Sequence, residues 1–182
     1  MRIFFLLLVL ALAGFVPPKL KLTTAKLAPG LTVGVPEGFA PLPDDGIAAK
    51  YPAARKPLAV YSSPNGHANF SVSSRPTDFQ APDYTVLLQI YKSSIQRLYS
   101  KVEFLKQEVR QIHGRNFVSF EFVSTVADTR RGDQLAAIRK YQTVQYTVQN
   151  DQMYVFTFDA PVNEQAQWQP VAQAVMGAIV LK

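Results

Sequence analysis

The residue types that usually carry acid–base or nucleophilic chemistry are scarce in this 182-residue sequence. It has two histidines, His67 and His113, each beside a turn-like stretch, and it has no cysteine. A Ser-His-Asp relay needs its nucleophile, base and orienting carboxylate within hydrogen-bond reach. No G-x-S-x-G motif is present to expose such a nucleophile. The sequence therefore favours turn positions for both histidines, and we expect a protein without catalytic residues that is not an enzyme.

Metal and phosphate sites have no recognisable motif either. The sequence lacks HExxH, the calcium-loop pattern and a glycine-rich phosphate loop. Asp44 and Asp45 are adjacent in a proline-rich stretch, where capping a short helical turn is their commoner role. Other carboxylates and cations occur on strand-like stretches, as in solvated cross-strand ion pairs: Glu103, Lys106, Glu108, Arg110 and Glu121. We expect neither a metal ion nor a cofactor.

Residues 50–57, KYPAARKP, combine three cations, two prolines and one aromatic residue just before a strand-like run. In one interpretation, Pro52 and Pro57 set the direction of the chain and the cations stay in water, since proline is common in turns. In the other, the segment forms a basic patch suited to an acidic or phosphate-bearing partner. The candidate partner-binding residues are Lys50, Tyr51, Arg55 and Lys56. Both interpretations stay open at this point.

The formal net charge of +6 is a moderate positive excess. Such an excess favours an anionic membrane surface or an acidic protein as a partner. The basic residues are scattered along the chain and do not gather on one predicted face, which argues against nucleic acid. Export of the protein, as indicated by its first residues, argues against nucleic acid as well.

Those first residues resemble a secretory signal. Arg2 is followed by an apolar run from residue 3 to residue 16, which is shorter than the roughly 20 residues of a membrane-spanning helix. The sequence Ala11-Leu12-Ala13 offers the small-x-small pattern of a cleavage site. We expect a signal peptide at residues 1–13, or to residue 16, and a periplasmic or secreted protein. The alternative is a membrane-anchored protein with an uncleaved N-terminal segment.

The first half of the remaining chain predicts short strands and one long helix. The strands are expected at residues 20–27, 31–35, 58–62 and 67–73, with a tight hairpin at Asn65-Gly66. Residues 83–101 have apolar side chains at three- and four-residue spacings, which predicts an amphipathic helix with Asp83 as its N-cap. The expected apolar stripe is Leu87, Leu88, Tyr91, Ile95, Leu98 and Tyr99.

From residue 102 the hydrophobic period becomes two, which predicts an antiparallel meander. The last element is expected at residues 163–181, with a looser turn at 164–167 and a continuous helix from near Gln169, because Pro170 is tolerated only in a first turn. The meander strands are expected at residues 102–112, 117–126, 135–149 and 153–161, with short turns at His113-Gly114-Arg115-Asn116 and Asn150-Asp151. This order predicts an α+β fold, an antiparallel meander covered by helices, in a single domain at residues 20–182.

Aromatic residues are concentrated in the meander. Most of them alternate onto one face and should be core residues. Phe117 and Tyr141 alternate onto the other face, where they are either core residues or an exposed partner surface. The core interpretation is the better supported of the two.

The segment VGVPEGFAPL, the basic proline-containing KYPAARKP, the long helix, the four-strand meander and the closing helix occur in this order. That arrangement resembles the PsbP-like superfamily, the α/β/α sandwich of PsbP, the Ran-binding Mog proteins and bacterial DcrB-like envelope proteins. The resemblance extends over residues 31–181 and depends on element order, not on a catalytic signature. It implies a non-catalytic accessory domain with an unidentified protein partner. DcrB-like proteins are often lipid-anchored, and this chain departs from them in having no cysteine.

The sequence thus predicts an exported accessory or binding protein of the bacterial cell envelope that acts through protein–protein contacts. Two alternatives remain. One is a small envelope hydrolase or lipid-binding enzyme with a cleft between helix and sheet, which would show convergent titratable groups. The other is a membrane-anchored chaperone that holds hydrophobic segments in an apolar groove.

Overall fold

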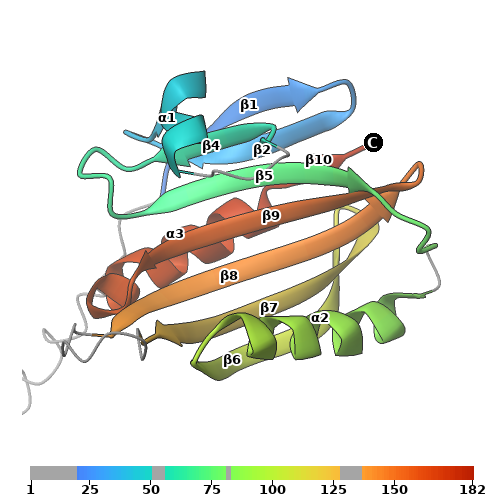
Figure 1. Cartoon of the computed structure of the whole chain (residues 1–182). Helices are drawn as coiled ribbons and strands as arrows, with labels where there is room; N and C mark the ends of the chain where they lie inside the picture. The colour runs from blue at the N-terminus through green and yellow to red at the C-terminus, as the bar shows by residue number, and fades with distance from the viewer. Residues whose placement is uncertain (1–19, 51–55, 81–82, 128–136) are drawn as a thin grey trace, which may run out of the picture.

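A computed structural model of the chain describes residues 20–50, 56–80, 83–127 and 137–182. Its largest element is a seven-stranded antiparallel sheet with the strand order β3-β4-β5-β9-β8-β7-β6 (Figure 1). The long strands β6 to β9 form the predicted four-strand meander, which is confirmed. The strands are β3 (Ala40–Pro41), β4 (Ala59–Ser62), β5 (Asn69–Pro76), β6 (Lys101–Ile112), β7 (Arg115–Val126), β8 (Ile138–Gln149) and β9 (Gln152–Pro161).

The meander turns have the backbone geometry that their residues predict. His113 and Gly114 have φ of 48° and 80°, and Asn150 and Asp151 have φ of 50° and 54°. Positive φ at both central residues matches the twist of a two-residue hairpin, and Gly, Asn and Asp tolerate it best. The predicted turn residues Arg115 and Asn116 instead belong to β7. The tight hairpin predicted at Asn65-Gly66 is wrong, because the β4–β5 connection spans residues 63–68 and only its Gly66 has positive φ, at 72°.

Helix α2 (Tyr84–Leu98) covers one face of the sheet over β6 and β7 (Figure 1). Its buried side chains include Leu87, which packs with Phe120 and Phe122 in one hydrophobic cluster. The predicted stripe is wrong at Leu98, which is 72% exposed. Asp83 is the N-cap, as predicted, but its carboxylate accepts a hydrogen bond from the Gln80 backbone N–H and makes no side-chain bond to the helix.

Helix α3 (Gln165–Gly177) covers the opposite face, after a short 3₁₀ turn η2 (Val162–Glu164). The expected start near Gln169 is wrong, because the helix begins four residues earlier and contains Pro170. The expected end at residue 181 is wrong as well, because the helix ends at Gly177 and Val180–Leu181 form the short strand β10. Proline removes the hydrogen bond to the carbonyl of Ala166. Ala166 is exposed, so water can bind that carbonyl and the helix continues.

A second sheet has the strand order β1-β2-β10. It consists of β1 (Leu22–Ala28), β2 (Leu31–Pro36) and β10 (Val180–Leu181). The remaining helix of the described residues is the short α1 (Asp44–Lys50). Buried residues of β2 and α3 share one hydrophobic cluster with the seven-stranded sheet. Helix α3 therefore packs against both sheets.

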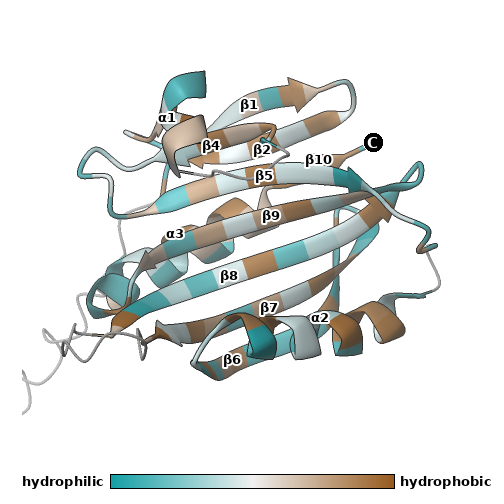
Figure 2. Ribbon diagram, in the orientation of Figure 1, coloured by the Kyte–Doolittle hydropathy of each residue, from teal (hydrophilic) through white to brown (hydrophobic). Residues whose placement is uncertain are grey.

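Both faces of the meander are hydrophobic core. Phe117 and Tyr141 are each 0% exposed and lie in the cluster with α3, whereas Val118 and Phe120 lie in the cluster with α2. Figure 2 shows hydrophilic and hydrophobic stretches alternating along β8 between these layers. The structure confirms the α+β prediction, with a meander covered by helices on its two faces. None of the helices within the described ranges is long and apolar enough to span a membrane.

Candidate functional site

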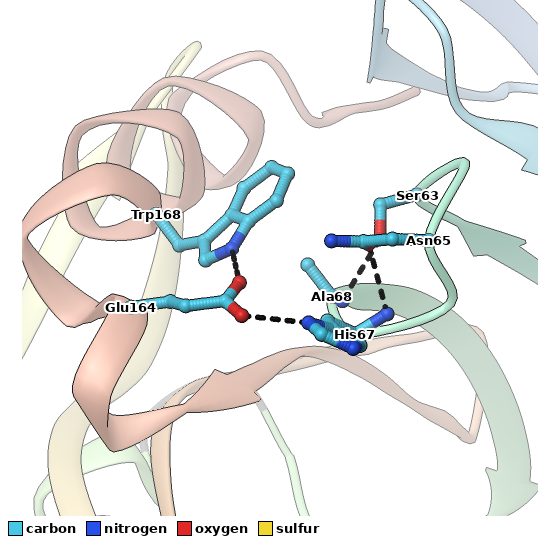
Figure 3. Close-up of polar contacts among 6 residues, drawn as sticks. All are labelled: Ser63, Asn65, His67, Ala68, Glu164 and Trp168. Atoms are coloured by element: carbon cyan, nitrogen blue, oxygen red, sulfur yellow. Dashed lines mark hydrogen bonds and ion pairs between the residues drawn. The ribbon is translucent and has the colours of Figure 1, made fainter.

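His67 lies in the β4–β5 connection and contacts the start of α3 (Figure 3). Its Nδ1 is 2.6 Å from Oε1 of Glu164, whose Oε2 accepts a 2.7 Å hydrogen bond from Nε1 of Trp168. The hydrogen bond from Trp168 and, to a smaller extent, the one with His67 hold the pKa of the Glu164 carboxyl below its ordinary value. No local sequence pattern predicts this contact, because the partners are 97 residues apart.

A histidine oriented by a carboxylate is the arrangement that a general base requires. The nearby Ser63 is not available as a nucleophile, because its hydroxyl donates a 2.6 Å hydrogen bond to Asn65 and accepts one from the Ala68 backbone N–H (Figure 3). Asn65 Oδ1 also accepts a hydrogen bond from the His67 backbone N–H. The network fixes the β4–β5 connection against α3, which is a structural role.

The other residues predicted from sequence are placed as follows. His113 is an exposed residue of the β6–β7 turn, as predicted. In the basic segment, Lys50 ends α1 and Lys56 is exposed, while Tyr51 and Arg55 lie outside the described residues. The basic patch therefore stays a prediction.

A polar cavity of about 300 Å³ lies between α3 and the β6–β8 part of the sheet. Strand β6 lines it with charged residues, β7 and β8 line it with polar residues and with Phe120, and α3 contributes Gln173 and Met176. A layer between a helix and a sheet is normally apolar, so polar residues there are candidates for function.

A β-bulge determines which β6 residues face this cavity. The pairing of β6 with β7 shifts between Phe104, which pairs with Phe122, and Lys106, which pairs with Glu121. Side chains alternate along a strand, so the extra residue Leu105 moves the following even-numbered positions to the α3 face. Without the bulge, the charged side chains of Lys106, Glu108 and Arg110 would face the α2 side.

Glu121 is the buried carboxylate of the cavity, with 8% of the residue exposed. It accepts hydrogen bonds from the hydroxyl of Tyr141 at 3.0 Å, from the amide of Gln169, and from the amide of Gln173 at 3.5 Å. All three donors are neutral, and within the described ranges Glu121 has no ion pair.

The interpretation of the strand carboxylates as solvated cross-strand ion pairs is therefore wrong for Glu121. Lys106, its direct partner across the strands, instead lies 2.9 Å from Glu108 on its own strand. Glu103 lies 2.7 Å from Lys101 on its own strand and also makes a longer, exposed contact of 3.9 Å with Arg139 of β8, which does cross strands. The bulge places Lys106 and Glu108 on the face that α3 covers, and α3 supplies neutral hydrogen-bond donors to Glu121. The alternation of β6 predicts neither feature.

Two buried oxygens on residues that line the same cavity have no hydrogen-bond partner among the described residues, namely Oγ1 of Thr143 and Oε1 of Gln145. Thr143 and Gln145 are 5% and 1% exposed, so bulk water does not satisfy them. Burial, followed by the charge of Glu121, raises the pKa of Tyr141, and its hydroxyl remains a donor. The cavity therefore offers an anion and two oxygens that accept hydrogen bonds.

The sequence carried one signal for this cavity. In β8, polar residues alternate onto the face that also carries the buried Tyr141, in the run YQTVQYTVQ. A strand buried on both faces usually reads as a hydrophobic run, so inward Thr143 and Gln145 mark an exception. No group of three His, Asp or Glu residues in the described part of the chain is placed to hold a metal ion.

No protein-family model and no curated protein matches the sequence. Solved structures do match. Cyanobacterial PsbP (CyanoP) from Synechocystis sp. PCC 6803 aligns with a TM-score of 0.55 and 14% identity, over 93% of this chain and 96% of that one. The Ran-binding protein Mog1p of Saccharomyces cerevisiae aligns with a TM-score of 0.55 and 16% identity, over 88% and 95%.

LpqN, involved in cell envelope biogenesis of Mycobacterium tuberculosis, aligns with a TM-score of 0.53 and 13% identity, over 90% of this chain and 92% of LpqN. At these identities the matches define the fold. The chain shares the fold of these three proteins, as the PsbP-like resemblance of its element order predicted.

Proposed function

We propose that the chain is an exported accessory protein of the bacterial cell envelope that binds other proteins and catalyses no reaction. The observation that carries the proposal is the fold, which is shared over most of both chains with LpqN, involved in cell envelope biogenesis, and with the Ran-binding protein Mog1p. The absence of a catalytic motif from the sequence supports a binding role. So does Ser63, whose hydroxyl is already engaged beside His67.

The apolar run at residues 3–16 supports export, with a signal peptide at residues 1–13, or to 16, and a single mature domain at residues 20–182. The test is the N-terminal mass of the protein from its native host after separation of cytoplasm, periplasm, membrane and medium. We expect a chain shortened by about thirteen residues, found in the periplasm or the medium. An intact chain in the cytoplasm would contradict export, and an intact chain in the membrane fraction would favour the anchored chaperone.

The partner surface that we propose is the basic segment with Lys50, Tyr51, Arg55 and Lys56. Cations beside an aromatic residue suit an acidic protein, and they also suit an anionic membrane surface. Capture of partners from an envelope extract should fall for Arg55→Glu relative to the unchanged protein. Arg97→Glu, at an exposed position in the last turn of α2, is the matched control and should leave capture unchanged. Equal recovery with Arg55→Glu would refute this surface.

A further inference from the structure

We propose that the polar cavity between α3 and strands β6–β8 binds a small zwitterion, with its ammonium group at Glu121 and its carboxylate at Arg110. This goes beyond the proposed function, because it concerns a small ligand and does not depend on the protein partner. The proposal rests on charged side chains of the cavity that have no ion pair, and on buried oxygens that have no hydrogen-bond partner, among the described residues.

The ammonium end follows from Glu121. A buried carboxylate is costly unless a cation or several donors compensate it, and the printed donors to Glu121 are the neutral groups of Tyr141, Gln169 and Gln173. The nearest cation by strand pairing, Lys106, is engaged with Glu108. Among the described residues, no cation of the cavity lies within ion-pair distance of Glu121.

The buried oxygens beside Glu121 complete a site for an ammonium group. Thr143 is directly opposite Glu121 across the strands, and Gln145 lies two residues further along the same face of β8. Thr143 Oγ1 and Gln145 Oε1 have no hydrogen-bond partner in the part of the chain that the structure describes. An ammonium group has three N–H donors and no acceptor. One donor for the carboxylate and one for each oxygen would satisfy all three protein groups.

The carboxylate end follows from Arg110. Its side chain is half-buried at the rim of the cavity and makes no ion pair with any other described residue. Its Nη2 lies 4.0 Å from the position that a Cβ on Gly177 would take, so it extends to the end of α3. A guanidinium group binds a carboxylate through two parallel hydrogen bonds.

The two ends are separated by several ångströms. Gln173 contacts Glu121, and the Arg110 guanidinium lies near Gly177, one helical turn or about 6 Å further along α3. Along the strands the backbone positions are further apart, about 13 Å, because Arg110 lies four residues beyond Lys106, the partner of Glu121. The volume of about 300 Å³ is at the lower limit of ligand cavities. A short linear molecule with an ammonium group at one end and a carboxylate at the other fits both the spacing and the volume.

The probe is ε-aminocaproate, which carries both charges on one flexible chain. Caproate and n-hexylamine have a chain of the same length with only the negative or only the positive group. Isothermal titration of the purified protein should give an affinity for ε-aminocaproate at least about tenfold above that for either single-charge compound. No measurable binding of ε-aminocaproate, or equal affinity for n-hexylamine, would overturn the proposal.

Variants assign the two ends. Glu121→Gln and Arg110→Gln should each lower the affinity for ε-aminocaproate about tenfold. Glu103→Gln and Arg139→Gln remove the same charges from exposed positions outside the cavity and should leave the affinity unchanged. Arg110 is only half-buried, so its variant keeps the test valid if Glu121→Gln does not fold. Binding that is unaffected by Arg110→Gln would refute the site.

Discussion

The hydroxyl of Tyr141 offers a direct measure of the electrostatics around Glu121. Tyr141 is 0% exposed, and its hydroxyl donates a 3.0 Å hydrogen bond to Oε1 of Glu121. Hydrogen bonds to charged groups contribute about 1.5–3 kcal/mol to stability, compared with about 0.5–1.5 for neutral pairs. Tyr141→Phe removes only the hydroxyl and should lower the free energy of unfolding by about 2 kcal/mol.

The matched control is Tyr146→Phe. Tyr146 is on the same strand, faces α2, and is 8% exposed. Its hydroxyl forms no hydrogen bond with another described residue, unlike that of Tyr141. Tyr146→Phe should therefore change the free energy of unfolding by no more than about 0.5 kcal/mol.

The assay is urea denaturation followed by far-ultraviolet circular dichroism, with equal m-values in all variants. The Glu121→Gln background converts the charged acceptor to a neutral one, so Tyr141→Phe should cost only about 1 kcal/mol there. The reasoning fails if Tyr141→Phe costs less than about 0.5 kcal/mol, or if its cost is the same in both backgrounds.

Three further predictions follow from burial and hydrogen bonding. Because burial raises the pKa of Tyr141 above its ordinary value of 10.0, only the unfolded chain loses that proton above about pH 10, and stability falls as pH rises; urea unfolding of Tyr141→Phe should show a shallower fall, and an equal slope would contradict this. The lowered pKa of Glu164 means that its stabilising contribution is present above its ordinary pKa of 4.5 and is lost as pH falls further. The emission of Trp168, the single tryptophan, should therefore change in acid and stop changing in Glu164→Gln; a transition that persists in the variant would exclude Glu164. Leu87→Ala should lower the free energy of unfolding by about 2–5 kcal/mol, since Leu87 is 0% exposed, whereas Leu98→Ala should lower it by less than about 0.5 kcal/mol. Equal losses of stability in urea unfolding would contradict the burial of Leu87 and the exposure of Leu98 on α2.

Much of the local structure was predictable because its causes are local. The period-two alternation of β6 to β9 and the turn residues at His113-Gly114 and Asn150-Asp151 act over a few positions, and the meander is as predicted. Leu98 shows where local reasoning stops. It continues the helical stripe, but it is the last residue of α2, and the sheet leaves it 72% exposed.

The cavity was not predictable from the alternation of β6. The bulge at Leu105 shifts the pairing of β6 with β7, and it alone brings Arg110 to the same face as Glu121. The polar inward positions of β8 were visible as Thr143 and Gln145, but their meaning needed the second helix. A helix cover and a strand register depend on contacts between distant segments, which no short window contains.

The sequence by itself determined the α+β element order, the turns of the meander and the PsbP-like resemblance, because hydrophobic period and turn chemistry are properties of neighbouring residues. Only the tertiary structure decided that His67 meets Glu164, 97 residues away, and that Glu121 is buried without an ion pair in the described part of the chain. Both depend on α3 packing across the sheet. Burial and charge compensation are properties of the packed whole, since a side chain is desolvated only by the segments that cover it.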